Sequence, residues 1–189
     1  MATNCVDKRI KICYIERMNK KIITLEMEVA LIDHIGVRQN IVVTNVSWGM
    51  FGNREVDIVK LTNNLWGSEI EIKVSKQDIL KDKKKKHGHE SNMFKFLYFA
   101  VPEYLKDFAL EHIPERAGLL TVEKYLAHEW TDDPFMKYRV SEVRKPVRNK
   151  SAVEWTHDER YKLMRLGTMR IETLKKNIVK LMKERSIIL

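Results

Sequence analysis

The sequence predicts a mixed α/β fold, an α+β arrangement in which a central mixed sheet is flanked by helices and followed by a long C-terminal helix. Three observations lead to this prediction. Helical and strand-like periodicities succeed one another in the order helix, three strands, helix, strand, helix, strand. The run FKFLYFAVP at 94–102 is almost entirely apolar, as expected for a strand buried on both faces. Residues 156–189 repeat apolar side chains at spacings of three and four, which is typical of a helix.

The first part of the chain is predicted to form one helix and three strands. The helix covers residues 22–35, and Gly36 follows as its C-terminal cap. Strands are expected at 40–51, 54–62 and 69–74, and the GN turn at 52–53 joins the first two into a hairpin. The three strands therefore form a meander. The stripe that the helix is expected to bury consists of Ile22, Leu25, Val29, Ile32 and Ile35.

The second part alternates helices and strands. A helix begins near residue 76, a strand covers 94–102, a short helix begins at 103, and a strand covers 116–123. Residues 124–156 are irregular, apart from a strand-compatible run at 137–145. Thr156 or Asp158 caps the last helix. Its apolar seam, close to a heptad pattern, consists of Met164, Gly167, Ile171, Leu174, Ile178 and Leu181.

These elements divide the chain into three parts. Residues 1–20 are a tail or the start of the first helix, residues 21–146 form the sheet domain, and residues 147–189 are a helical appendage. The seam of the appendage suits packing on its own domain or a homodimer through the C-terminal helix. Its many Lys and Arg residues also permit contacts with a DNA backbone.

Composition excludes several classes of protein. Hydrophobic residues make up 44% and charged residues 32% of the 189, which is typical of a folded globular chain. The two cysteines, Cys5 and Cys13, form no C-x-x-C pair, which argues against a disulfide scaffold or a structural zinc site. With no long apolar run and no signal core, we expect a cytoplasmic protein without a membrane span. A net charge of +9 favours nucleic acid as the partner.

Two neighbouring strands carry the residues that suggest chemistry. Glu71 and Lys73 are two apart and project from one face of their strand, and Asp57 lies on the preceding strand. Carboxylates from adjacent strands suit Mg²⁺ or Mn²⁺, with the backbone carbonyl of Ile72 as a further ligand. A lysine on the same face can hold the attacking water or offset charge on a phosphate. The alternative interpretation is an ordinary solvated strand face.

This D…E-x-K arrangement resembles the PD-(D/E)XK nuclease superfamily. The flanking sequence over roughly 54–123 looks like the MmcB group of DNA-repair endonucleases within it. Two positions depart from the pattern, since Val56 stands where a proline is usual and Ile79 replaces an aromatic residue. The matching residues are Glu71, Lys73, Ser75, Asp78, Asp82 and Lys84, then Phe99, Ala100, Val101 and Pro102, then Pro114, Gly118 and Leu119.

The resemblance implies a restriction-endonuclease-like core and gives roles to residues around the motif. Asp57 and Glu71 would ligate the metal, and Lys73 would position water for attack on phosphorus. In many of these nucleases an acid on the first helix adds a contact, which points to Glu28 here, with Glu26 as the other candidate; solvent exposure is the alternative for both. The lysine-rich segment is either a solubilising run or a loop that contacts the phosphate backbone. The lysines expected to make that contact are Lys76, Lys83, Lys84, Lys85 and Lys86.

Other residues near the motif have simpler interpretations. Ser75 and Asp78 are placed to cap the helix that follows, and a role in orienting Lys73 is compatible with that. Asp82 is expected on a solvated helix face. His87 and His89, in a lysine-rich loop, are expected to be surface residues, because no third ligand is in view; metal binding is the alternative. Glu69 shares a face with Glu71 but stands outside the E-x-K pair, so it is interpreted as a bystander.

The sequence therefore predicts a metal-dependent nuclease that hydrolyses nucleic-acid phosphodiesters, with DNA as the expected substrate, in DNA repair or mobile-element biology. The alternative is a catalytically silent nuclease-like fold that acts as a nucleic-acid-binding or assembly adaptor. Binding of Mn²⁺ separates the two hypotheses, because only the nuclease needs a metal at the acidic residues.

Overall fold

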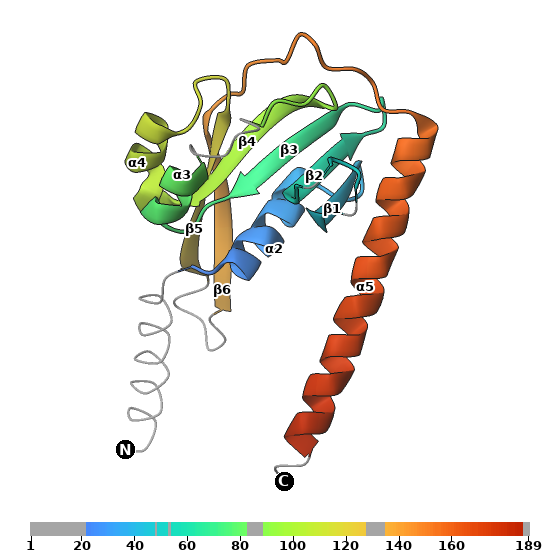
Figure 1. Ribbon diagram of the computed structural model, residues 1–189. Helices are drawn as coiled ribbons and strands as arrows, with labels where there is room; N and C mark the ends of the chain where they lie inside the picture. The colour runs from blue at the N-terminus through green and yellow to red at the C-terminus, as the bar shows by residue number, and fades with distance from the viewer. Residues whose placement is uncertain (1–21, 48, 53, 83–88, 128–134, 187–189) are drawn as a thin grey trace, which may run out of the picture.

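The computed structural model describes residues 22–47, 49–52, 54–82, 89–127 and 135–186. Figure 1 shows a single curved sheet with helices against both faces and one long helix beside it. Its helices are α2 (Thr24–Ile35), α3 (Lys76–Asp82), the 3₁₀ turn η1 (Glu103–Leu105), α4 (Lys106–His112) and α5 (His157–Ser186). Its strands are β1 (Asn40–Val46), β2 (Val56–Thr62), β3 (Gly67–Ile72), β4 (Phe94–Pro102), β5 (Gly118–Ala127) and β6 (Phe135–Arg144).

The six strands lie in the sheet in chain order, from β1 to β6. The pairs β1–β2 and β2–β3 are antiparallel, which confirms the predicted meander. The next two pairs, β3–β4 and β4–β5, are parallel and are connected across α3 and across η1 with α4. The last pair, β5–β6, is antiparallel. The predicted fold class, a mixed sheet flanked by helices with a long C-terminal helix, is confirmed.

Three apolar cores hold the layers together. On one face, α2 packs through Leu31 against Ile58 and Ile70. On the other face, α3 and α4 cover β4 and β5 through residues such as Ile79 and Phe99. A third core forms where Trp155 and Leu163 pack against β1 and β2. The register places Val59 opposite Glu69 and Glu69 beside Leu97, so the second and third cores lie on the same face.

The buried stripe of α2 differs from the predicted one. The side chains of Leu25 and Val29 are 63% and 48% exposed, whereas Met27, Ala30 and Leu31 are buried. The helix is therefore rotated relative to the prediction, because the small residue Ala30 allows close approach to the sheet while Leu31 fills the core. The predicted cap is confirmed, since Gly36 is left-handed at φ 77° and its N–H donates to the carbonyl of Ile32.

The observed ends of several elements also differ from the predicted ends. β1 stops at Val46, short of the predicted 51, because a turn follows in which Gly49 and Gly52, both with positive φ, form a bridge. The strand-compatible run at 137–145 is β6, and β5 continues to Ala127. Thr156 caps α5 as predicted, accepting a hydrogen bond from the N–H of Glu159. Among the described helices, none has the length and apolar character to cross a membrane.

The C-terminal segment contributes to the sheet domain before it leaves it. Trp155 is 2% exposed and its indole N–H donates to the carbonyl of Met93. Leu163, near the start of α5, is fully buried on β1 and β2. Trp155 and Leu163 are thus part of the packed body, and the portion of α5 in which every described side chain is exposed begins later, at residue 171.

Candidate functional site

The structure brings the three predicted motif residues together. Asp57 on β2 and Glu71 on β3 lie on one face of adjacent antiparallel strands, next to the paired residues Ile58 and Ile70. The Asp57 carboxylate accepts a hydrogen bond of 2.7 Å from the backbone N–H of Ile72. That bond turns the Asp57 side chain toward β3. The predicted arrangement of the two acids on neighbouring strands is therefore present.

Lys73 completes the predicted constellation. Its ammonium donates to Oε2 of Glu71 at 2.7 Å and lies 3.1 Å from Oδ1 of Asp82. Burial lowers the pKa of Lys73, but the charges of Glu71, Asp82 and Asp57 outweigh that effect and raise the pKa above its ordinary value. Lys73 is therefore a fixed cation at neutral pH, suited to holding an anionic oxygen and unsuited to acting as a base.

Glu69 belongs to the site, contrary to its interpretation as a bystander. Its side chain is fully buried. One carboxylate oxygen lies 2.6 Å from a guanidinium nitrogen of Arg54, and the other lies 2.7 Å from Nδ1 of His89. A buried carboxylate requires such partners, because desolvation of the charge is otherwise very costly. The alternation that places Glu71 on this face places Glu69 there as well, one pleat earlier.

His89 and Asp82 are buried and in contact, so the prediction of a surface histidine and a solvated aspartate was wrong. His89 is 4% and Asp82 7% exposed, and Nε2 of His89 lies 2.5 Å from Oδ2 of Asp82. Burial lowers the pKa of His89, but its bonds to Asp82 and Glu69 raise it to about 9. His89 also has a left-handed backbone, φ 57°, and its carbonyl accepts a hydrogen bond from Arg116.

Charged groups thus form one connected chain across this face of the sheet. It runs from Arg54 through Glu69, His89, Asp82 and Lys73 to Glu71, with Asp57 beside its end. We call these seven residues the acidic cluster. Four are carboxylates and three carry positive charge when His89 is protonated, which leaves one negative charge in excess. The excess negative charge is compatible with a bound cation.

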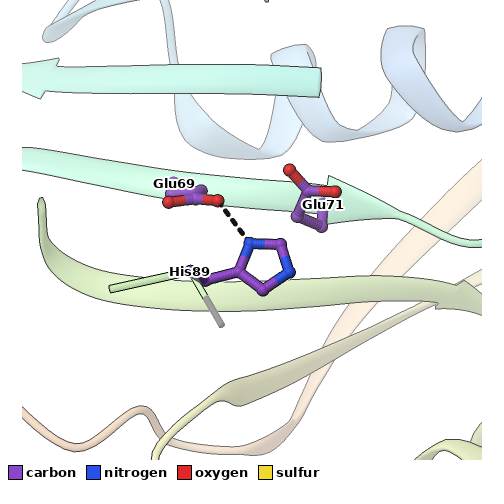
Figure 2. A group of neighbouring side chains, drawn as sticks. All are labelled: Glu69, Glu71 and His89. Carbon is purple, nitrogen blue, oxygen red and sulfur yellow. Dashed lines mark hydrogen bonds and ion pairs between the residues drawn. The ribbon is translucent and has the colours of Figure 1, made fainter. Parts of the chain in front are cut away.

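Part of the acidic cluster has the geometry of a metal site. Glu69, Glu71 and His89 each offer one ligand atom, and these atoms all lie within 4.8 Å of one another. Figure 2 shows the three side chains converging from β3 and from the segment before β4, with the bond between Glu69 and His89 drawn. Imidazole together with carboxylates is a common donor set for divalent metals. This group can hold a metal ion, and it differs from the predicted set of Asp57, Glu71 and Ile72.

The predicted ligand Ile72 takes part through a different atom. Its N–H donates to Asp57, and the role of its carbonyl as a ligand stays a prediction. The two donor sets overlap at Glu71, which belongs to both. An all-oxygen set of Asp57, Glu71 and a carbonyl suits Mg²⁺, whereas the set with His89 suits Mn²⁺ or another metal that accepts nitrogen.

The supporting residues lie near the cluster but have local partners. Ser75 caps α3 as predicted: its hydroxyl accepts the N–H of Asp78 at 3.2 Å and donates to the Asp78 carboxylate at 2.7 Å. Glu28, on α2, accepts a hydrogen bond from the Asn45 side chain. Burial raises the pKa of Glu28 above its ordinary value; the Asn45 bond opposes this, and the nearby charge of Glu55 adds to it. These contacts join Glu28 to the β1–β2 end of the sheet rather than to Asp57 or Glu71.

Of the lysines predicted to bind nucleic acid, Lys76 is exposed at the start of α3, with its ammonium 4.9 Å from the ring centre of Phe108. Lys81, on the same helix, is exposed as well. The other predicted lysines, Lys83, Lys84, Lys85 and Lys86, lie outside the described residues, as does His87.

Four members of the acidic cluster were not predicted as site residues from the sequence: Arg54, Glu69, Asp82 and His89. Glu69 had a signal, since E-x-E-x-K places three ionisable side chains on one face. Asp82 also had one, because it follows Ile79 by three residues and so shares the buried side of α3. His89 had only the HGH pair as a signal, because its position beside β3 depends on the tertiary fold.

Comparison with known proteins gives the fold and no more. Neither the known protein families nor the curated proteins contain a match to this chain. A solved structure of a protein of unknown function from Silicibacter pomeroyi is similar over 80% of this chain and 88% of its own, with a TM-score of 0.54 and 18% sequence identity. The two chains share an architecture, and the similarity assigns no activity to either.

Proposed function

We propose that this chain is a metal-dependent nuclease that hydrolyses phosphodiester bonds, with DNA as the substrate. The observation that carries the proposal is the convergence of Asp57, Glu71 and Lys73 on one face of β2 and β3. The pattern was expected from sequence. The Lys73 ammonium lies 2.7 Å from the Glu71 carboxylate, and the N–H of Ile72, between them in sequence, holds the Asp57 carboxylate at 2.7 Å. The resemblance to PD-(D/E)XK nucleases gives the same assignment from independent residues along the flanking helix and strand.

The residues divide the work according to their charge. Asp57 and Glu71 would hold Mg²⁺ or Mn²⁺, which, when bound, offsets phosphate charge and makes water nucleophilic. Lys73 is held protonated by its carboxylate neighbours, so it would bind a phosphate oxygen or the attacking water as a hydrogen-bond donor. Asp82 holds the Lys73 ammonium from a second direction. The pair of contacts fixes where that ammonium points.

The donor chemistry fits a divalent cation. The acidic cluster carries one excess negative charge with His89 protonated, and two when His89 gives up its proton to bind a metal. A divalent ion then balances the cluster. Lys76 and Lys81 are exposed on α3, the helix that supplies Asp82, and would contact the phosphate backbone without reading bases.

The test is cleavage by purified full-length protein. Supercoiled plasmid and end-labelled single- and double-stranded oligonucleotides are incubated with Mg²⁺, with Mn²⁺, or with EDTA. We expect cleavage only with metal and its loss in Lys73→Ala. The matched control is Lys106→Ala, which removes a lysine from an exposed pair with Glu103. Unchanged cleavage in folded Lys73→Ala, or equal cleavage in EDTA, overturns the mechanism.

One observation favours the adaptor as a second candidate. Glu71 and Lys73 are 2% and 7% exposed and already paired with each other, as a purely structural network would be. An adaptor would bind nucleic acid through its basic surface and leave the acidic cluster without metal. Titration with Mn²⁺, followed by calorimetry, separates the two: heat that disappears in Glu71→Gln supports the nuclease. No binding of Mn²⁺, together with salt-dependent DNA binding, supports the adaptor.

A further inference from the structure

The long helix α5 has two halves with different surroundings. In the first half Leu163 is fully buried, and a Cβ at Gly167 would lie 3.3 Å from a methyl group of Val43 on β1. Arg170 marks the end of this contact, where its guanidinium donates to the backbone carbonyl of Asn45. From residue 171 to residue 184 every side chain is exposed, and Figure 1 shows this half running past the edge of the sheet.

The exposed half nevertheless keeps a row of large aliphatic side chains. Its members follow spacings of three, four and three, and we call them the α5 seam: Ile171 (57% exposed), Leu174 (59%), Ile178 (47%) and Leu181 (58%). In proteins most of the stability of a helix comes from packing of its apolar face. A contiguous exposed apolar row of this kind marks an interaction surface.

The seam continues a contact that the fold already makes. Gly167, four residues before Ile171, occupies the same row and faces Val43 on β1. The helix thus contacts its own sheet at Gly167 and Arg170, and its side chains are exposed from Ile171 onward. The occupant of the uncovered part must present a matching apolar ridge of similar length, starting where β1 ends.

We propose that a second copy of this chain covers the α5 seam, with the two α5 helices antiparallel. The seam is self-complementary in that direction: Ile171 would pack on Leu181 of the second copy, and Leu174 on Ile178 of the second copy. Two-fold symmetry repeats each pair, which gives four aliphatic layers without a polar residue. No other segment needs to be invoked, because each helix supplies the ridge that the other lacks.

The charged residues beside the seam favour the antiparallel direction over the parallel one. Side by side in antiparallel register, Arg170 lies near Glu184 of the second copy, and this attractive pair occurs twice. In parallel register, Arg170 would instead lie near Lys175 of the second copy, which is repulsive. Among the side chains described from 171 to 184, Lys175 is unfavourable in the antiparallel arrangement, because it lies near Lys175 of the second copy at the two-fold axis. Its removal should therefore tighten the dimer.

The first experiment measures the mass of the full-length protein in solution by light scattering, over a dilution series. We expect twice the 22.4 kDa of one chain at high concentration. The double variant Leu174→Glu with Ile178→Glu should be monomeric, and Lys175→Ala should shift the midpoint to lower concentration. Val179→Glu is the control, since Val179 is 50% exposed on the same helix but lies off the seam.

The outcomes of that experiment are unambiguous. A monomeric wild-type chain overturns the proposal, whether the seam is then bare, covered by residues 1–21 of the same chain, or free for a different protein. A dimer that survives the double substitution overturns it as well, because the contact then lies elsewhere. The readout is mass, so it stays informative even if the proposed nuclease activity is absent.

The second experiment tests direction by disulfide trapping. In a background where Cys5 and Cys13 are replaced by Ser, two single-cysteine proteins are made, Ile171→Cys and Leu181→Cys. The antiparallel dimer predicts that the mixture cross-links and that neither protein cross-links alone, because ten residues of helix separate identical positions by about 15 Å. A parallel dimer gives the opposite pattern and overturns the proposed direction.

Discussion

The carboxylate of Asp57 is anchored by the backbone of Ile72, whose N–H donates to it at 2.7 Å, next to Glu71. One hydrogen bond therefore fixes the separation of the two acids proposed to share a metal, and it does so across two strands. The side chain of Asp57 replaces a backbone acceptor where the pairing of β2 and β3 comes to its end.

Two substitutions of Asp57 separate this bond from the charge. Asp57→Asn keeps an acceptor for the Ile72 N–H, so its free energy of unfolding in EDTA should stay within about 1 kcal/mol of wild type, while metal binding is lost. Asp57→Ala leaves that N–H without its acceptor. It should therefore lose metal binding and, in addition, lower the free energy of unfolding by about 1–3 kcal/mol. Urea unfolding followed by circular dichroism makes the measurement. Equal stability of the two variants contradicts the anchoring role.

His89 is expected to be a major determinant of stability without any metal. The variant His89→Ala removes the imidazole that bridges the buried carboxylates of Glu69 and Asp82. Loss of one member of a buried charged network costs about 3–5 kcal/mol, so urea unfolding in EDTA should show a loss of at least about 3 kcal/mol. His157→Ala, at the exposed start of α5, is the control and should change stability by less than about 0.5 kcal/mol.

Acid should loosen the attachment of α2 to the far strands. Burial raises the pKa of Glu26, but hydrogen bonds from Lys124, from the Ile23 N–H and from Tyr138 outweigh burial. The pKa therefore falls below the ordinary value of 4.5. A group whose pKa is lowered by folding stabilises the native state above its unfolded pKa, and that contribution is lost as the pH falls through the folded pKa.

Glu26→Gln tests this dependence. The stability difference between wild type and the variant should be largest above pH 4.5 and should shrink below it, as measured by urea unfolding at several pH values. Glu103→Gln is the control, because Glu103 pairs with Lys106 at the surface, with both side chains about 40% exposed. A difference for Glu26→Gln that stays constant with pH would refute the assigned role of the carboxylate.

Gly67, at the start of β3, is expected to tolerate no side chain. A Cβ there would lie 2.6 Å from the indole nitrogen of Trp155 and 2.7 Å from the carbonyl of Met93, two atoms that hydrogen-bond each other. Gly67→Ala should therefore destabilise the protein by about 1–3 kcal/mol. In Gly167→Ala the nearest atom is a Val43 methyl group at 3.3 Å, and the gain in helix propensity, about 1 kcal/mol, offsets the crowding. Thermal unfolding of both variants makes the comparison.

The sequence was sufficient for the elements and for the pair of strands that carry the motif. Glu71 and Lys73 are two residues apart in a strand, so they project from the same face regardless of their surroundings. Adjacent strands joined by a short turn pair almost inevitably, so Asp57 was expected beside Glu71. The helix caps at Gly36 and Thr156 were predictable for a similar reason, since a cap depends on local backbone geometry.

Burial was the harder property to predict. The stripe of α2 was assigned from apolar spacing, but Leu25 is exposed and Ala30 is buried, because the sheet selects residues by fit as well as by polarity. Asp82 and His89 were interpreted as surface residues because charge usually indicates solvent. His89 pairs with both Asp82 and Glu69, and these contacts allow the charged side chains to be buried. Such a network of mutual partners cannot be recognised from single residues.

The strands succeed one another across the sheet in the order in which a ribosome makes them. No strand has to insert between two that are already paired, so the sheet can grow from its first edge as the chain emerges. All seven residues of the acidic cluster come from one stretch, 54 to 89, and the strands around it are complete long before α5 is synthesised. A nascent chain therefore assembles its candidate reaction centre first and acquires the helix proposed to recruit a second copy last.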